Sequence, residues 1–207
     1  MPRSRAHTRE RLLAAALDVF AEEGFGRSTV EQVCERAGYT RGAFYSNFTS
    51  LDELFLAMWE GRSAQMLRAI EDAVVAAESD GESDAVDLDV AAARVLSVIP
   101  VDDRWYRVTS EFTAHALRHP ELRVAMAERE AAIQSVILPL VESALARAGR
   151  SVTDRSALGR ALVAVHDGTT AQVLLEPDRT DVAAARTDLF LCVLRNYSEP
   201  NSPSENK

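Results

Sequence analysis

Apolar residues recur along most of the chain at spacings of three and four positions, which is the period of amphipathic α-helices. In residues 8–23, for example, Leu13, Leu17 and Phe20 share one face. No stretch shows the convincing alternation of apolar and polar residues that marks a strand. The pattern predicts an all-α protein, with helices over residues 8–23, 28–38, 40–48, 51–77, 88–99, 102–118, 120–147, 154–176 and 181–197.

Helix-start signals place the beginnings of several helices. Ser28 and Glu31 have the spacing of a capping box, in which each side chain bonds the backbone amide of the other residue. Ser50 and Glu53 repeat this spacing before the long helix. Thr40 is the expected N-cap of the short helix that lies between these two boxes.

Two polar stretches interrupt the helical pattern. Residues 78–89 are acidic and poor in core-forming side chains, so they predict a solvated connector. Residues 198–207 contain no core-forming side chain and predict disorder. The expected organisation is an N-terminal domain over residues 1–50, a larger helical domain over residues 51–198 and a disordered tail over residues 199–207.

Charge is distributed unevenly along the chain. The 207 residues carry a formal net charge of −9, which argues against a general nucleic-acid coat. Residues 1–50 alone carry a net charge of +1, which leaves −10 for the remainder. Such an asymmetry is typical of a chain with one end suited to an anionic partner. Exposed charges are screened beyond about 8 Å at physiological salt, so the acidic remainder does not forbid a local basic contact.

Several classes of chemistry have no support in the sequence. Cys34 and Cys192 lie far apart in apolar helical patterns and are interpreted as buried free thiols. We find no signal peptide and no apolar run near about 18 residues, which predicts a cytoplasmic protein without a membrane partner. Paired carboxylates, metal-ligand spacing, a phosphate loop and a nucleophile–base pair are all missing. The expectation is therefore no metal, no cofactor and no enzyme activity.

The connection between the second and third short helices predicts a helix-turn-helix, whose second helix is presented outward. Gly38 suits the turn because a left-handed backbone costs little only at glycine. Phe44 and Phe48 are four residues apart and would pack inward. The opposite face and the start of the preceding helix supply candidate DNA contacts, namely Ser28, Thr29, Arg41, Gly42, Tyr45 and Asn47.

These residue types match the chemistry of a DNA duplex. Arg41 can make a bidentate contact to guanine in the major groove. Gly42 has no side chain, so the backbone can approach the bases. Tyr45 and Asn47 can donate to phosphates, which positions a protein without reading sequence. From spacing alone, an ordinary helical hairpin with Arg41 and Tyr45 merely solvated remains an alternative.

From about Arg11 to Leu56 the chain resembles the tetracycline-repressor (TetR) family of bacterial transcriptional regulators. The most specific feature is AFYSNF followed by a capped long helix. The segments HALRHPELRVAMAEREA and HDGTTAQVLLEP resemble the second domain of that family more loosely. The resemblance implies a helix-turn-helix DNA-binding domain, joined by a long helix to a helical ligand-binding and dimerisation domain.

The resemblance also implies roles for single residues. Arg41 and Gly42 would face the bases, and the phosphates would be held by Ser28, Thr29, Thr40, Tyr45 and Asn47. The chain departs from the family pattern after Phe48, where many members carry a lysine that reaches a phosphate. Thr49 and Leu51 stand at these positions, and Thr49 is kept as a candidate DNA contact. The basic arm formed by Arg3, Arg5 and Arg9 is either a substitute for that lysine or a flexible tail.

The last two helices predict a homodimer. One short recognition helix covers few bases, so specificity usually needs two half-sites and two subunits. Residues 154–176 and 181–197 are more apolar than a pair of surface helices should be. The resemblance implies a four-helix interface built from these ranges, while closure of the monomer core is the alternative.

A ligand pocket is expected among the middle helices, where aromatic residues follow helical spacing beside a few polar ones. The candidate ligand-binding residues are Trp59, Met66, Trp105, Phe112, His115, His166 and Gln172. An aromatic stripe is more often plain core, and that alternative stays open. The expected function is a ligand-responsive repressor that a largely apolar small molecule releases from operator DNA. The alternatives are a helical ligand-binding or protein-interaction module that has lost operator binding, and an all-helical enzyme.

Overall fold

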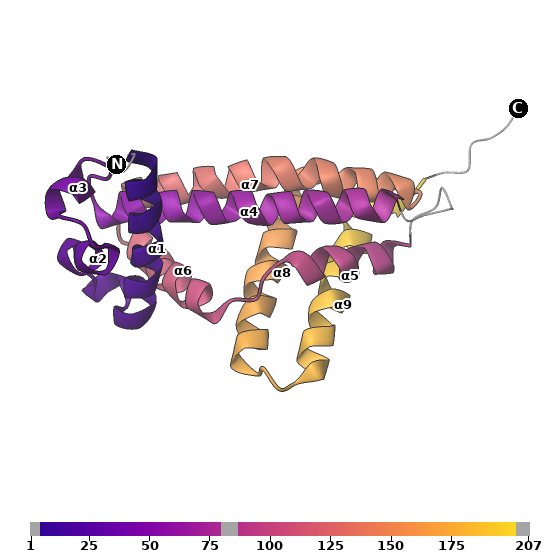
Figure 1. The fold of residues 1–207 in the computed structure, drawn as a ribbon. Coiled ribbons are helices and arrows are strands. Elements are labelled where there is room, and N and C mark those ends of the chain that lie inside the picture. Colours follow the sequence, from indigo (N-terminus) through magenta and orange to yellow (C-terminus); the bar gives the residue numbers. More distant parts are fainter. Residues whose placement is uncertain (1–4, 80–86, 202–207) are drawn as a thin grey trace, which may run out of the picture. The chain divides into compact units, whose positions relative to one another are not determined.

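The computed structural model describes residues 5–79 and 87–201 of the chain (Figure 1). The described residues are almost entirely α-helical, which confirms the predicted all-α class. The helices are α1 (Arg5–Glu23), α2 (Val30–Ala37), α3 (Arg41–Tyr45), α4 (Leu51–Ser79), α5 (Leu88–Val98), α6 (Asp103–Ala116), α7 (Pro120–Arg147), α8 (Arg155–Leu175) and α9 (Thr180–Asn196). A 3-10 turn η1 (Phe25–Arg27) and the short strands β1 (Arg150–Val152) and β2 (Ser198–Pro200) complete the elements.

The chain folds into two compact units, each assembled from two separate segments. The first unit comprises Met1–Ala64 and Asp102–Arg129, and the second comprises Gln65–Val101 and Glu130–Lys207. Helices α4 and α7 each contribute residues to both units. Packing therefore groups α6 with the short helices, so the packing units differ from the functional division expected at residue 50.

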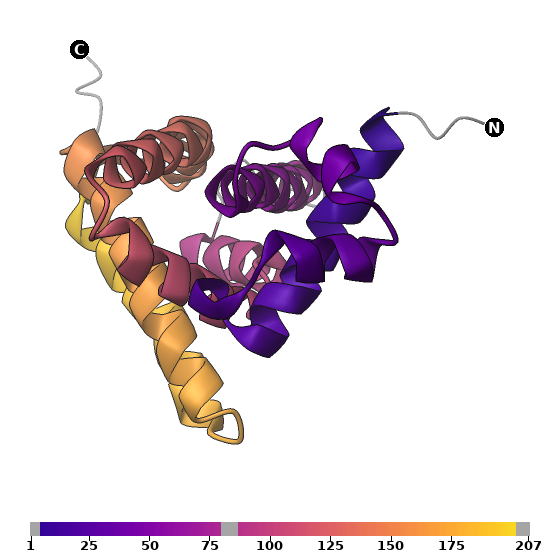
Figure 2. The same ribbon diagram turned by 90° about the vertical axis from the view of Figure 1, so that its left-hand side faces the viewer.

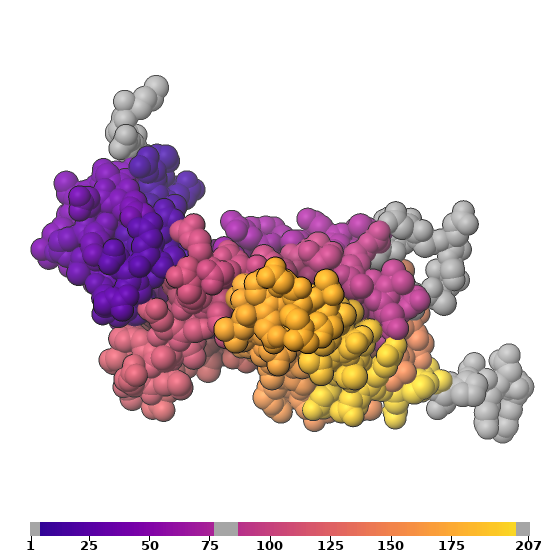
Figure 3. All heavy atoms as spheres, turned by 90° about the horizontal axis from the view of Figure 1, so that it is seen from below, coloured from indigo at the N-terminus to yellow at the C-terminus, as the bar shows by residue number. Residues whose placement is uncertain are grey.

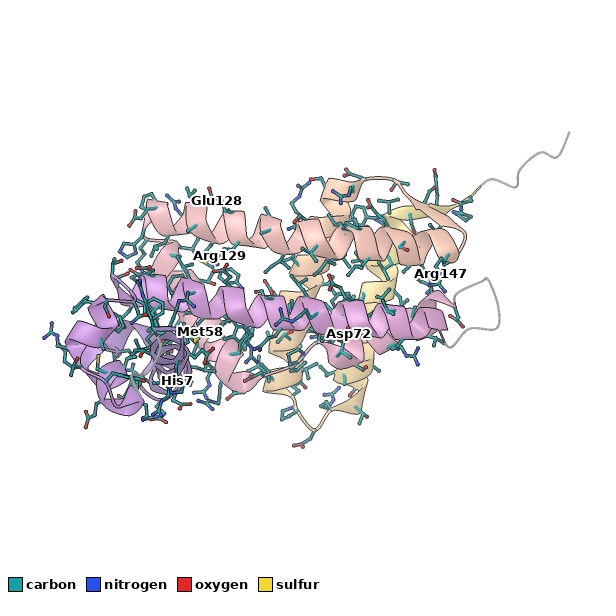
Figure 4. The ribbon with its side chains drawn as sticks, turned by 45° about the horizontal axis from the view of Figure 1, so that its top comes forward. His7, Met58, Asp72, Glu128, Arg129 and Arg147 are labelled. Carbon is teal, nitrogen blue, oxygen red and sulfur yellow. The ribbon has the colours of Figure 1, made fainter. Side chains whose placement is uncertain are left out.

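Phenylalanines form the core of the first unit. Phe44, Phe55 and Phe112 are completely buried, and Phe20 and Phe48 nearly so. The rings of Phe55 and Phe112 stack with centroids 3.7 Å apart. Full burial of one such side chain contributes about 1.5–3 kcal/mol, so this cluster accounts for much of the stability of the unit. Within this unit, an ion pair of 3.4 Å joins Glu60 of α4 to Arg129 of α7. Arg129 is labelled in Figure 4.

Two glycines in the first unit adopt backbone conformations that other residues rarely take. Gly38 has a φ of 72° and ends α2 by donating its N–H to Cys34 and Glu35, as the sequence predicts. Gly24 has a φ of 85°, and a Cβ there would lie 2.9 Å from the Glu111 carboxylate. The Glu111 carboxylate accepts the Phe25 N–H at 2.6 Å, and this bond connects α6 to η1.

The capping box of α2 lies one residue later than predicted. Thr29 and Gln32 form it, whereas Ser28 donates its hydroxyl to the Gly24 carbonyl at 2.8 Å. The reason is the η1 turn, which uses the Ser28 N–H for a bond to the Phe25 carbonyl and so delays the start of α2. Sequence spacing alone does not reveal this turn.

Helices α8 and α9 lie side by side in the second unit and run in opposite directions (Figure 1). Helix α5 packs against α9. A leucine-rich cluster closes the core with residues from α5, α7, α8 and α9. Its buried members are Ala92, Leu138, Leu145, Leu158, Leu191 and Leu194.

Three expectations about the second unit are corrected. Ser198–Pro200 pairs antiparallel with Arg150–Val152, so residues 199–201 are ordered rather than part of a disordered tail. Arg150 stabilises this pairing through bonds to the Ser198 hydroxyl at 2.8 Å and the Ser198 carbonyl at 2.6 Å. This pairing also corrects the expectation of a chain without strands. Cys192 is exposed, although its apolar neighbours predicted burial; Cys34 is buried as expected.

The remaining predicted segments fall partly outside the described residues. The predicted connector at 78–89 overlaps the end of α4 at Ser79 and the start of α5 at Leu88, and residues 80–86 and 202–207 are not described. Within the described ranges, no helix is both long and apolar enough to cross a membrane.

Candidate nucleic-acid interface

Helices α2 and α3 form a helix-turn-helix on the first unit (Figure 2). Thr40 caps α3 by accepting the Ala43 N–H at 3.2 Å, as predicted. Phe44 and Phe48 point into the core, which also confirms their predicted burial. Helix α3 spans only five residues, so it is held by this packing rather than by its own helix propensity.

The opposite side of α3 carries a group of exposed residues. Thr40, Arg41, Gly42 and Tyr45 are all exposed, and half of the Tyr45 surface is accessible. A Cβ on Gly42 would meet nothing closer than the Thr40 hydroxyl at 3.7 Å, so the backbone there is open to approach. Thr29 at the start of α2 is exposed as well. Together with the exposed Thr49, these five residues form the exposed part of the predicted DNA-contact set.

Arg41 has a carboxylate partner within the chain. Its Nη1 lies 2.7 Å from Oε1 of Glu31, and both side chains are more than half exposed. Its guanidinium also lies 5.9 Å from the centroid of the Tyr45 ring. A hydrogen bond to Tyr45 and the charge of Glu31 raise the pKa of Arg41. Sequence reasoning assigned Glu31 to a capping box and missed this pairing across the turn.

Three other predicted contact residues bond to the protein itself. The Ser28 hydroxyl donates to Gly24, and Asn47 Nδ2 donates to the Ala43 carbonyl at 2.8 Å. Thr49 donates both its N–H and its hydroxyl to the Glu53 carboxylate at 2.6 Å. These bonds lower the pKa of Glu53, with the hydroxyl contact the largest cause. A phosphate contact from any of the three side chains requires one of these bonds to be shared or exchanged.

Basic residues of α1 contact the chain at the ends of α2 and α3. Arg5 lies within α1 and donates to the Ser46 carbonyl at 2.8 Å. Arg9 lies over the Phe48 ring at 5.2 Å from its centroid, and Arg11 donates to the Ala37 carbonyl at 3.1 Å. The described part of the predicted basic arm, Arg5 and Arg9, is thus helical and contacts residues just after α3; Arg3 lies outside the described residues.

The predicted ligand-binding residues are divided between the two units. Trp59, Trp105, Phe112 and His115 belong to the first unit, where Phe112 is fully buried and the Trp105 ring stacks on Phe55 at 6.1 Å. His115 Nε2 lies 3.2 Å from the Asp52 carboxylate. The contacts of these four residues are those of a packed aromatic core.

The other three ligand candidates belong to the second unit. Met66 is half-buried and Gln172 is exposed. His166 faces Arg186 of α9, whose Nη2 lies 3.3 Å from its Nδ1. Burial first, and then the charge of Arg186, lowers the pKa of His166 to about 4, so its ring is neutral near pH 7. Arg186 was not predicted as a site residue. Among the described residues, no group of three or more His, Cys, Asp or Glu is placed to hold a metal ion.

The fold and the exposed face of α3 define a helix-turn-helix DNA-binding protein. Comparison with known families extends this assignment. Residues 12–58 match the family model of the tetR family of bacterial regulatory proteins. Residues 95–191 match the C-terminal model of BetI-type transcriptional repressors.

Individual relatives agree with these matches. The chain is 30% identical over 151 residues to the HTH-type transcriptional repressor AcnR of Corynebacterium efficiens, covering 72% of this chain and 71% of AcnR. This protein therefore belongs to the TetR family of transcriptional regulators. It is 40% identical over 55 residues to the regulator SrpR of Pseudomonas putida, and this match spans only 26% of SrpR. The structure of Bacillus subtilis FadR in complex with stearoyl-CoA has the same fold, with a TM-score of 0.64, 18% identity and coverage of 90% of this chain and 97% of FadR.

Proposed function

We propose that this protein is a repressor that binds operator DNA as a homodimer and releases it when a small molecule binds. The observation that carries the proposal is the exposed face of α3. Arg41, Gly42 and Tyr45 project from a helix whose other side is fixed by buried phenylalanines. Arg41 would read a base and the surrounding hydroxyls and amides would hold phosphates.

The α8–α9 pair is the proposed dimer interface. Gly168 lies in the middle of α8, where glycine costs about 1 kcal/mol relative to alanine. A Cβ on this residue would meet nothing within 4 Å of the same chain, so packing within one copy does not require a glycine there. Leu175 and Leu189 are large apolar side chains that remain exposed on these helices. Figure 3 shows these two helices from their connected end, and a second copy packed along their sides would cover such residues.

Contacts of α6 within the first unit would pass any displacement of this helix to the DNA-binding helices. Glu111 of α6 accepts the Phe25 N–H of η1, and His115 of α6 pairs with Asp52 in the first turn of α4. A ligand that displaced α6 would therefore shift the elements that hold α2 and α3. A 100-fold loss of operator affinity needs only about 2.7 kcal/mol of differential ligand binding between the two states.

The test is operator binding by an arginine variant, measured by fluorescence anisotropy at several fixed salt concentrations with DNA from upstream of the gene. Arg41→Ala is expected to weaken binding roughly 5- to 160-fold and to relax preference at one base position. Arg123→Ala removes an exposed arginine from α7 and serves as the control, with binding unchanged.

Two results would count against the proposal in different ways. Equal affinity of Arg41→Ala and the wild type would remove the base-reading role of Arg41. No binding of the wild type to upstream DNA at low salt would favour the module that has lost operator binding.

A further inference from the structure

Arg186 is a buried cation in the seam between α8 and α9. Only 6% of its surface is exposed. Its Nη1 donates to the Thr170 hydroxyl at 2.8 Å, its Nη2 faces His166 Nδ1, and its guanidinium lies 5.7 Å from the Phe190 ring centroid. Within the described part of the chain, no carboxylate forms an ion pair with it.

A buried charge without a counter-charge is unfavourable because it loses its hydration and gains no ion pair in return. Burial alone lowers the pKa of Arg186, with no acidic group acting in the opposite direction. A methionine of similar length would fill the same seam without this cost. The position is therefore well suited to an anion that this chain does not itself supply.

His166 adds a second donor beside the guanidinium. Its ring is neutral, and Nδ1 faces an N–H of Arg186, so Nδ1 accepts and the ring proton is assigned to Nε2. No described residue bonds Nε2, and His166 is only partly buried. The histidine thus places an available N–H at the accessible edge of the Arg186 site.

One side of α9 points away from this site, whereas the exposed Leu189 of the proposed dimer surface follows Arg186 by three residues and lies near it. Ala184 and Asp188 are exposed and lie two residues on either side of Arg186, about 200° around the helix axis. A second copy that docks on those residues would not reach the guanidinium. A carboxylate of a partner copy at Arg186 would leave no preference for an added carboxylate, so the titration described below distinguishes it from a small molecule.

We propose that Arg186, His166 and Thr170 bind the carboxylate of a small organic anion. The inference rests on the ligand-responsive function proposed above and gives its ligand a charge. The effector would be a molecule with an apolar body and one acidic end rather than a purely apolar compound. Arginine is suited to this role because its planar fork matches a carboxylate with two N–H donors.

The experiment compares carboxylates with neutral amides of the same shape. Isothermal titration would measure decanoate against decanamide and benzoate against benzamide, with the full-length wild type, Arg186→Met and Arg68→Met. Arg68 is an exposed arginine of the same unit, so its variant controls for the loss of one charge.

The wild type and Arg68→Met should bind at least one carboxylate at least tenfold more tightly than its amide, and Arg186→Met should lose this preference. Equal binding of acid and amide, binding of neither compound, or a preference that survives in Arg186→Met would each overturn the proposal.

A stability measurement separates ligand binding from a purely structural role. Without ligand, Arg186→Met is expected to fold, with a urea midpoint equal to or above that of the wild type. A clear drop in the midpoint would indicate that Arg186 is a structural residue. If that variant does not fold, Arg186→Lys replaces the fork by a single ammonium and should reduce the preference for carboxylate severalfold. An unchanged preference in Arg186→Lys would overturn the assignment.

Failure of this inference can be distinguished from failure of the proposed function. A wild-type protein that binds upstream DNA but shows no carboxylate preference overturns only the anion site. One that prefers carboxylates but binds no upstream DNA overturns only the repressor proposal.

Discussion

The α2–α3 region and the α8–α9 seam each place an arginine at a candidate binding site, but they treat its charge in opposite ways. Arg41 is exposed and has the Glu31 carboxylate 2.7 Å away. Arg186 is buried and bonds only neutral groups, the hydroxyl of Thr170 and the ring of His166. In the first region water and an acid already stabilise the cation, whereas in the second the stabilising charge is missing.

The contrast shows what a binding partner has to supply in each region. DNA must displace Glu31 from Arg41, so part of the attraction is lost in breaking an existing pair. An anion at Arg186 displaces no carboxylate and enters a site of low dielectric, where electrostatic attraction is stronger than in water. The exposed arginine is thus suited to reversible and salt-sensitive contact, and the buried one to selective recognition of a single charged group.

The largest expected effect comes from a substitution that breaks the packing that keeps Arg41 on the exposed side of α3. Phe44→Ala removes a fully buried ring and should destabilise the first unit by about 3–5 kcal/mol. Tyr45→Ala, at the next and half-exposed position, should cost less than about 1 kcal/mol. Urea unfolding followed by circular dichroism measures both. Equal losses of unfolding free energy in the two variants would show that α3 does not depend on its buried face. The contrast with the seam, where Arg186→Met is expected to keep its stability, would then disappear.

The second effect is a pH dependence of stability that comes from His166 in the seam between α8 and α9. The pKa of His166 is lowered from 6.5 to about 4 in the folded protein, first by burial and then by Arg186. As the pH falls, His166 therefore binds a proton at a higher pH in the unfolded chain than in the folded protein. The contribution of His166 to stability is complete above pH 6.5 and falls as the pH drops from 6.5 towards 4, by roughly 3 kcal/mol in total.

His166→Asn tests this dependence because asparagine keeps an acceptor for Arg186 but does not titrate. Its unfolding free energy should fall less than that of the wild type between pH 7 and pH 4. Parallel pH profiles for the wild type and His166→Asn would show that the seam does not keep this ring neutral.

Much of the fold and of the candidate DNA interface could be predicted from the sequence because both depend on local signals. Helical periodicity gave the order of the helices, Gly38 marked the turn, and the spacing of Phe44 and Phe48 gave the buried side of α3. What stayed hidden depends on contacts through space. Glu31 meets Arg41 only after the turn has formed, and β1 pairs with β2 across 48 residues without an alternating pattern.

The Arg186 site had a signal that periodicity reasoning overlooked. Val182, Arg186 and Phe190 are spaced four apart, so the arginine occupies an apolar stripe of α9. A charged residue in such a stripe indicates either that the buried face of the helix was assigned wrongly or that the charge is buried because it has a function. The exposure of Cys192 could not be found in this way, because α9 has apolar residues on more than one side.

The smallest expected effect concerns the ion pair between Arg41 and Glu31. Glu31→Gln keeps the size and hydrogen-bonding ability of the side chain but removes the charge that holds Arg41 before DNA arrives. Because an exposed ion pair is weak, operator affinity should rise only roughly two- to fivefold. The increase should be similar for unrelated DNA and for the operator, since the lost acid repels any phosphate backbone.

Gln32→Glu would add a charge at the neighbouring position and is expected to act in the opposite direction. Anisotropy titrations against operator and scrambled duplexes at two salt concentrations measure these differences. If Glu31→Gln weakened operator binding instead, Glu31 would contact the DNA as an acceptor, for instance from a cytosine amino group, and would not act as a restraint on Arg41. In that case Arg41 and Glu31 would contact the bases together, and only Arg186 would depend on an anion from outside the chain.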